Sequence, residues 1–184
     1  MIPTLISHFF EPMVVLAVVS VVAGFHAGLP GGDLARYLYG LFGLMIIPVL
    51  VIRWWLVVTK RVSDWDIRNR SQREKPLLIL LAFTLLNLWY ALYFGNPVLT
   101  QLFVIFIVWI LGFAAVTLFW KMSGHAGITA LATGFVIAWY GWAWWPVLLL
   151  VSLVGWARVV TKNHTVTQVI AGALYSWLLL VLIG

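Results

Sequence analysis

Two histidines in this chain occupy positions that suit phosphoryl-transfer chemistry. His125 follows Ser123 and Gly124 directly before an apolar segment, and His164 lies six residues after Arg158. A neutral imidazole is a nucleophile, and a protonated imidazole is an acid. One histidine that attacks phosphorus and one that protonates the leaving alkoxide are sufficient for transfer through a phosphohistidine. An arginine and a helix N-terminus would stabilise the phosphoryl charge.

The residues next to each histidine predict how it is held. Ser123 is a suitable N-cap residue, so the pair Ser123-Gly124 indicates a helix start, where unpaired N–H groups and the helix dipole attract an anion. Gln168 lies four residues after His164, one turn along a helix, where it can bond the imidazole and hold its tautomer. A plain helix cap at Ser123 and an interfacial, hydrogen-bonding His125 are the alternative interpretation.

The composition determines which elements must position these groups. Of the 184 residues, 64% are hydrophobic and only 9% are charged, which excludes a water-soluble domain. The expected fold is all-α: a polytopic membrane helical bundle of six or seven transmembrane helices, forming one domain over residues 1–184. No cleavable signal peptide is expected. The absence of cysteine excludes disulfides and thiolate chemistry.

Seven apolar segments are the expected spans. They are separated by turn signals such as Gly95-Asn96-Pro97, or by polar stretches. The predicted ranges are 12–29, 38–59, 77–94, 98–120, 126–142, 146–162 and 165–184. The short segments on either side of the tryptophan cluster at 139–145 keep the count between six and seven. Arg53, inside the second span, is expected either to extend toward the basic face or to contribute to the site.

Positive charge is concentrated in three polar stretches between these spans or at their ends. Nine of the eleven basic residues fall there, and an even number of crossings separates each stretch from the next. All three therefore meet on one membrane face, which the positive-inside rule predicts to be cytoplasmic. Such a cationic face suits phosphate or anionic lipid head groups. The nine residues are Lys60, Arg61, Arg68, Arg70, Arg73, Lys75, Lys121, Arg158 and Lys162.

These motifs resemble those of the type-2 phosphatidic acid phosphatase superfamily of membrane lipid phosphatases. Its second motif, Pro-Ser-Gly-His, is similar to the stretch ending at His125, with Met122 in place of proline. Its third motif, Ser-Arg-x5-His-x3-Asp, matches Arg158 and His164 with both spacings kept and Gln168 in place of aspartate. Its first motif, Lys-x6-Arg-Pro, has the spacing of Arg68-x6-Lys75-Pro76 with the two basic residues exchanged.

The resemblance implies a role for each matched residue. His164 would be the nucleophile, and His125 the general acid that later activates water. Gln168 would hold His164 without the charge of the family's aspartate, and Arg68, Lys75, Ser123, Gly124 and Arg158 would bind phosphate. The implied activity is that of a phosphoric monoester hydrolase, without metal or cofactor. It would act on phosphatidic acid, phosphatidylglycerophosphate or a polyprenyl diphosphate, and on the last as an acid anhydride hydrolase.

Two other functions remain open from the residues. Asp64-x-Asp66 among arginines is typical of Mg²⁺-dependent prenyl or phosphatidyl transferases, although such sites usually have a second acidic cluster. A lipid-binding, transport or structural membrane protein that keeps the phosphate site without turnover is the non-catalytic alternative. The expected partners are the bilayer and a lipid phosphate, with no nucleic acid. The sequence leaves a homo-oligomer open.

Overall fold

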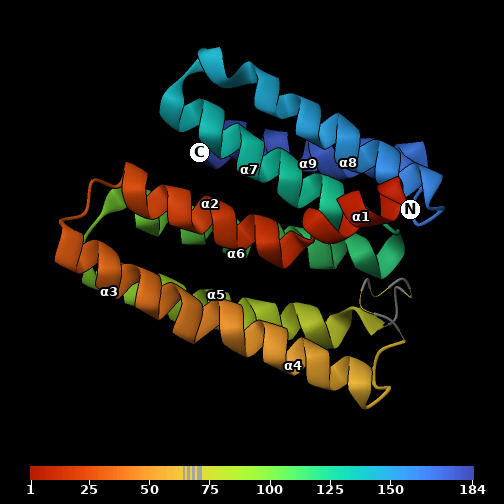
Figure 1. The fold of residues 1–184 in the computed structure, drawn as a ribbon, viewed down its shortest axis with the longest axis horizontal. Coiled ribbons are helices and arrows are strands. Elements are labelled where there is room, and N and C mark those ends of the chain that lie inside the picture. Colours follow the sequence, from red (N-terminus) through yellow and green to blue (C-terminus); the bar gives the residue numbers. More distant parts are fainter. Residues whose placement is uncertain (64, 66, 68, 70–71) are drawn as a thin grey trace. The chain divides into compact units, whose positions relative to one another are not determined.

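The computed structural model describes residues 1–63, 65, 67, 69 and 72–184, and in these the regular structure is entirely helical (Figure 1). The fold class is therefore confirmed as all-α. The chain forms two compact units that divide within helix α2 (Pro12–His26). We call Met1–Val19 with Trp120–Gly184 the terminal unit and Ser20–Phe119 the central unit, and describe each by itself.

A long continuous helix begins the central unit after α2. α3 (Gly31–Leu41), the π-helical turn η1 (Phe42–Ile46) and α4 (Ile47–Val58) together span 28 residues. Pro48 cannot donate to a carbonyl one turn earlier, and the π-helical turn directly before it accommodates that missing bond without ending the helix. Tyr37 joins α3 to α2, since its hydroxyl donates to the Ser20 carbonyl at 2.9 Å.

An antiparallel hairpin of two long helices completes the central unit. α5 (Glu74–Tyr93) and α6 (Pro97–Phe119) pack against each other along their length. The turn uses Gly95 at φ 58°. Asn96 caps α6 by accepting from the N–H of Val98 at 3.0 Å, and its amide donates to the Ala27 carbonyl. The predicted hinge at 95–97 is confirmed.

Three helices dominate the terminal unit, and α1 (Ile2–Phe9) packs against one of them, α8. α7 (Gly124–Tyr140) is followed by a turn at Gly141, the 3₁₀ segment η3 (Trp142–Leu148) and α8 (Leu149–Val160). α9 (Val166–Ile183) then packs against both α7 and α8 (Figure 1). Trp142, Trp144 and Trp145 are exposed on η3, as expected of aromatic residues at a membrane interface.

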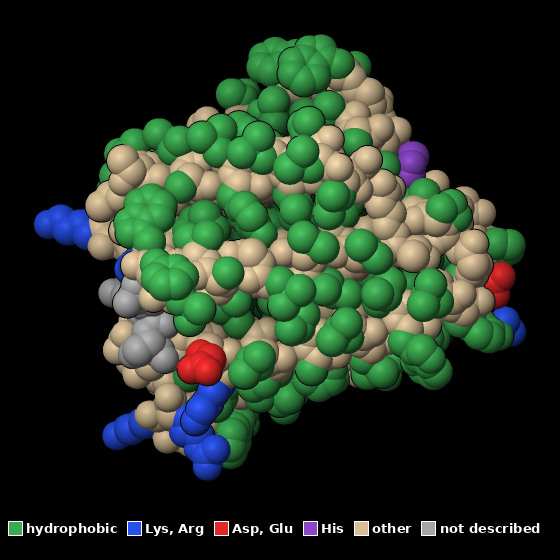
Figure 2. Space-filling model, turned by 180° about the vertical axis from the view of Figure 1, so that it is seen from behind, with side chains coloured by type: hydrophobic (Ala, Val, Ile, Leu, Met, Phe, Trp, Pro, Cys, Tyr) green, Lys and Arg blue, Asp and Glu red, His purple; other side chains and the backbone are tan. Residues whose placement is uncertain are grey.

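Five helical segments in the described residues are long and apolar enough to cross a membrane. A sixth is counted if α1 and α2, which meet at 47°, form one broken span. α7, with 17 residues, lies at the lower limit of spanning length. Figure 2 shows a face covered largely by hydrophobic side chains, with Lys and Arg at its edges. Large apolar side chains such as Trp89, Leu118 and Val181 are exposed, as lipid contact requires. The chain is an integral membrane protein.

Candidate active site

The first wall of the candidate site is the start of α7. Ser123 has extended backbone angles, and its hydroxyl oxygen accepts from the N–H of Ala126 at 3.4 Å. Its carbonyl accepts from the N–H of Gly127 at 3.0 Å. Ser123 is therefore the N-cap, as predicted. Gly124 and His125 lie in the first turn, where main-chain N–H groups have no preceding helical carbonyl to bond. The His125 side chain is only 5% exposed.

The second wall is the tight connection between α8 and α9. The carbonyl of Arg158 accepts from the N–H groups of both Asn163 and His164, at 3.1 and 3.2 Å. Lys162 takes a positive φ of 55° to close this turn. The side chains of Arg158 and His164 are 2% and 7% exposed. A guanidinium cannot lose its charge, so its burial is costly unless a counter-charge or hydrogen bonds compensate.

Three contacts bring these two walls together. The Nζ atom of Lys121 donates to the Asn163 carbonyl at 2.8 Å, and the N–H of Ser123 donates to the Gln168 carbonyl at 3.1 Å. Gly172 permits the third contact, because a Cβ at this position would lie 2.5 Å from the Ser123 carbonyl oxygen. The predicted meeting of the second and third polar stretches is confirmed. Neither Lys121 nor Gly172 was predicted to hold them together.

Gln168 combines two functions in the first turn of α9. Its Oε1 atom lies 3.0 Å from Nδ1 of His164 and accepts from the main-chain N–H of Thr165 at 3.2 Å. The hydroxyl of Thr165 accepts in return from the N–H of Gln168 at 3.3 Å. This is a capping box. Sequence analysis predicted the bond to His164 but missed the cap, although the Thr-x-x-Gln spacing indicates it.

The capping box determines the tautomer of His164. A main-chain N–H can only donate, so the atom of Gln168 that faces Thr165 must be the amide oxygen. The same oxygen faces Nδ1 of His164, and an oxygen acceptor requires a proton on that nitrogen. In the neutral ring the lone pair is then on Nε2. Nε2 of the neutral His164 ring is therefore the nitrogen without a proton.

The first predicted motif lies in the central unit. Arg68, and also Asp64 and Asp66, lie outside the described residues. Lys75, in the first turn of α5, is exposed. Arg73 is buried and its Nε donates to the Ile67 carbonyl at 3.1 Å. Arg53 reaches the same loop, where its guanidinium bonds the Trp65 carbonyl and covers the Trp65 ring. The role of Lys75 in phosphate binding stays a prediction.

Among the described residues, no group of three or more His, Asp or Glu side chains is placed to hold a metal ion. Asp64 and Asp66 are not among these residues, so the Asp-x-Asp magnesium site stays a hypothesis.

Comparison with known proteins gives one informative similarity. The chain is 46% identical over 56 residues to a lipid A 4′-phosphatase from Helicobacter pylori (strain J99 / ATCC 700824). The matched segment is 30% of this chain and 28% of that relative, so the chain matches less than a third of the relative's length. No protein-family model matches the chain. No solved structure matches it either. The chain is thus a helical membrane protein, part of which is similar to a phosphatase of lipid A.

Proposed function

We propose that this protein hydrolyses the phosphate or diphosphate monoester of a membrane lipid through a phosphohistidine intermediate, without a metal ion. The main support is the hydrogen-bonded set Thr165–Gln168–His164, which in the neutral ring puts the lone pair on Nε2, the atom that would attack phosphorus. The partial similarity to a lipid A 4′-phosphatase supports the same class of substrate. The candidate lipids are phosphatidic acid, phosphatidylglycerophosphate, a polyprenyl diphosphate and lipid A.

The reaction needs two steps, and the two histidines alternate in them. In the first step the Nε2 lone pair of His164 attacks the terminal phosphorus, its ester P–O bond (or, in a diphosphate, its anhydride P–O bond) breaks, and protonated His125 gives its proton to the leaving oxygen. The products are the lipid alcohol, or a lipid monophosphate from a diphosphate, and phosphorylated His164. In the second step neutral His125 takes a proton from water, whose oxygen attacks phosphorus. The P–N bond then breaks, inorganic phosphate leaves, and both rings return to their initial state.

The phosphoryl oxygens need donors that are in place before the reaction. Arg158 offers a planar, permanently charged guanidinium, and the first turn of α7 offers the N–H of Gly124. The hydroxyl oxygen of Ser123 already accepts from Ala126, so its hydrogen is directed to another acceptor, which in this proposal is the phosphate.

The glutamine in place of an aspartate has a specific consequence. Replacing the aspartate of a catalytic triad by an amide lowers kcat by about 10⁴, in part because the wrong tautomer is held. Here the capping box orients the amide so that the correct tautomer is held. What remains missing is the negative charge that would stabilise the phosphorylated imidazolium, so turnover is expected to be slow but measurable.

The test is phosphate release from these lipids by the purified full chain in detergent micelles containing EDTA. Wild type is expected to release phosphate, to be inhibited by vanadate, and to form a phosphorylated protein that is stable in base and labile in acid. His164→Asn should abolish both release and labelling. His8→Asn is the matched control, because His8 is exposed on α1 and should behave as wild type.

Two outcomes would overturn the proposal. Activity that required Mg²⁺ would favour the transferase or a metal-dependent hydrolase. Saturable binding of the lipid phosphate that His164→Asn leaves intact, without hydrolysis by wild type, would establish the non-catalytic alternative.

A further inference from the structure

An apolar groove of about 430 Å³ runs between α8 and α9 on the terminal unit, within the range of about 300–1,000 Å³ typical of small-molecule sites. Val159 and Val166 lie at one end, next to the turn that carries His164, and Val151 and Trp177 lie at the other. From Val166 to Trp177, α9 rises about 16 Å. Both helices belong to segments that are apolar enough to cross a membrane. The groove between them would therefore run parallel to the hydrocarbon chains of the bilayer.

The charges at the two ends of the groove differ. Three cations, Lys121, Arg158 and Lys162, lie in or beside the turns at the His164 end, whereas the opposite end is apolar. The sequence of the terminal unit contains a single acid, Glu11, whose carboxylate accepts from the N–H groups of Met13 and Val14. A ligand that complements this pattern has one anionic end and one hydrocarbon end.

We propose that the α8–α9 groove binds one hydrocarbon chain of the lipid phosphate whose head group reacts at His164. This inference rests on the proposed function and names the part of the substrate that gives it specificity. Ser152 and Gly155 leave room along the α8 wall. A Cβ at position 155 would lie 2.7 Å from Cγ1 of Val169, so glycine there lets the two helices approach closely beneath the groove.

Trp177 closes the end of the groove that is far from His164. Its indole Nε1 donates to the Ala130 carbonyl of α7 at 3.1 Å, and the ring packs on the buried cluster of Ala130, Val151 and Ala173. Because both the polar and the apolar side of its indole are held, Trp177 has a fixed position at the end of the groove. It therefore sets the length of chain that the groove accepts.

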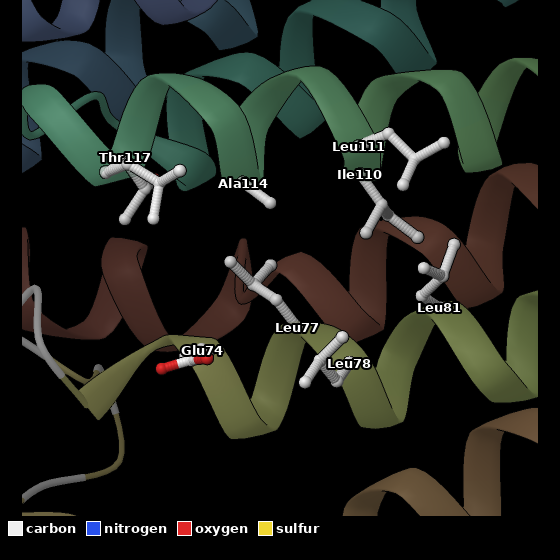
Figure 3. Close-up of a pocket in the computed structure, with 9 residues that line it drawn as sticks. Glu74, Leu77, Leu78, Leu81, Ile110, Leu111, Ala114 and Thr117 are labelled. Atoms are coloured by element: carbon white, nitrogen blue, oxygen red, sulfur yellow. The ribbon is translucent and has the colours of Figure 1, made fainter.

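The central unit provides a matched groove for comparison. About 250 Å³ of space between α5 and α6 is lined mainly by Leu, Ile and Ala side chains, with Glu74 at its polar end (Figure 3). The Glu74 carboxylate would repel a phosphate head group. Ala114 lines this second groove. Ala114→Phe is therefore a control that adds a phenyl ring to a groove without the proposed function.

The test compares kcat/KM for single-chain alkyl phosphates of increasing length with kcat/KM for the water-soluble ester p-nitrophenyl phosphate. Ser152→Phe places a ring in the α8–α9 groove at an exposed position. We expect Ser152→Phe to lower kcat/KM for the long-chain alkyl phosphates about tenfold relative to kcat/KM for p-nitrophenyl phosphate. Ala114→Phe should leave that ratio at the wild-type value. Trp177→Ala should move the preferred chain length upward.

Equal effects of Ser152→Phe and Ala114→Phe, or a preferred length that Trp177→Ala does not change, would overturn the inference. If wild type hydrolyses neither substrate, the proposed function fails, and the groove is tested by binding alone. A long-chain alkyl phosphonate with a photoreactive group at its tail should then label α8 or α9 near Trp177. Labelling of α5 or α6, or none, would exclude this groove.

Discussion

The two units of the molecule differ in where their polar side chains lie. The terminal unit buries Ser123, His125, Arg158 and His164 around two helix ends. In the central unit Arg73 is buried against its own loop, whereas Lys60, Arg61 and Lys75 are exposed at helix ends. Burying a polar group costs free energy unless hydrogen bonds or an opposite charge compensate it. This difference supports the proposed phosphate site of the terminal unit.

The arginines give the largest expected contrast between the units. Arg158→Leu should lower kcat about a hundred- to a thousandfold, because it removes preorganised donors from the phosphoryl group. Arg36→Leu should change kcat little, since the Arg36 side chain is 67% exposed and pairs with Asp33 on the surface, where ion pairs contribute little. Arg158→Lys should recover part of the loss, because lysine supplies charge without the planar fork. Steady-state phosphate release measures all three, and equal losses in Arg158→Leu and Arg36→Leu would remove the distinction.

Glycines offer a second contrast, with opposite signs for stability. Gly172→Ala should destabilise the protein by about 1–3 kcal/mol and reduce activity, because the added Cβ would meet the Ser123 carbonyl. Gly32→Ala in α3 meets no atom within 4 Å and should be neutral or stabilise by up to about 1 kcal/mol. Thermal unfolding in detergent, with phosphate release measured in parallel, checks both. Two variants of unchanged stability would show that α9 does not need to approach Ser123 closely.

Two glutamines, one in each unit, sharpen the comparison further. Gln168→Glu preserves the capping box and adds a charge, so kcat should rise about tenfold through a charge-assisted bond to His164. Gln72 of the central unit accepts from the N–H and the hydroxyl of Ser63, and Gln72→Glu should leave kcat unchanged. Gln168→Met should lower kcat, since it removes the acceptor. A slower Gln168→Glu enzyme would argue against a developing positive charge on His164.

The smallest effect is expected at the cap itself. Thr165→Ala should lower the free energy of unfolding by about 1 kcal/mol through loss of one cap bond. It should reduce kcat only a fewfold, because the amide of Gln168 is oriented by the main-chain N–H of residue 165. Asn96→Ala, which removes the cap of α6, should cost similar stability without affecting kcat. A loss of kcat as large as that of Gln168→Met would mean that the Thr165 hydroxyl is the essential partner.

Local spacing was sufficient to predict much of this site. The helix start at Ser123, the hinge at Asn96 and the contact of His164 with Gln168 each depend on residues within four positions of one another, where helix geometry alone decides the distance. The Lys121–Asn163 bond and the fit of Gly172 against Ser123 join segments about 40 residues apart or more. Such contacts depend on how α7 and α9 pack, which no pattern within either helix specifies.

The number of spans was harder to predict. The sequence predicted six or seven, and the described residues contain five, or six if α1 and α2 form one broken span. The fifth predicted span, 126–142, corresponds to α7, which begins at Gly124 and ends at Tyr140. The sixth begins as a 3₁₀ segment before α8. Proline and tryptophan in that segment indicate an interface but do not specify a helix type. The π-helical turn before Pro48 was likewise not predicted, since a proline within an apolar run is compatible with a kink, a break or a bulge.

The capping box at the start of α9 links the stability of one helical turn to the reactivity of one nitrogen atom. In the proposed mechanism, unwinding of residues 165–168 would release the Gln168 amide and let the proton of His164 move to Nε2, which silences the nucleophile while the rest of the bundle stays folded. The enzyme would then lose activity on heating before it loses its helices. Its working temperature would be determined by the fraying of a single helix end.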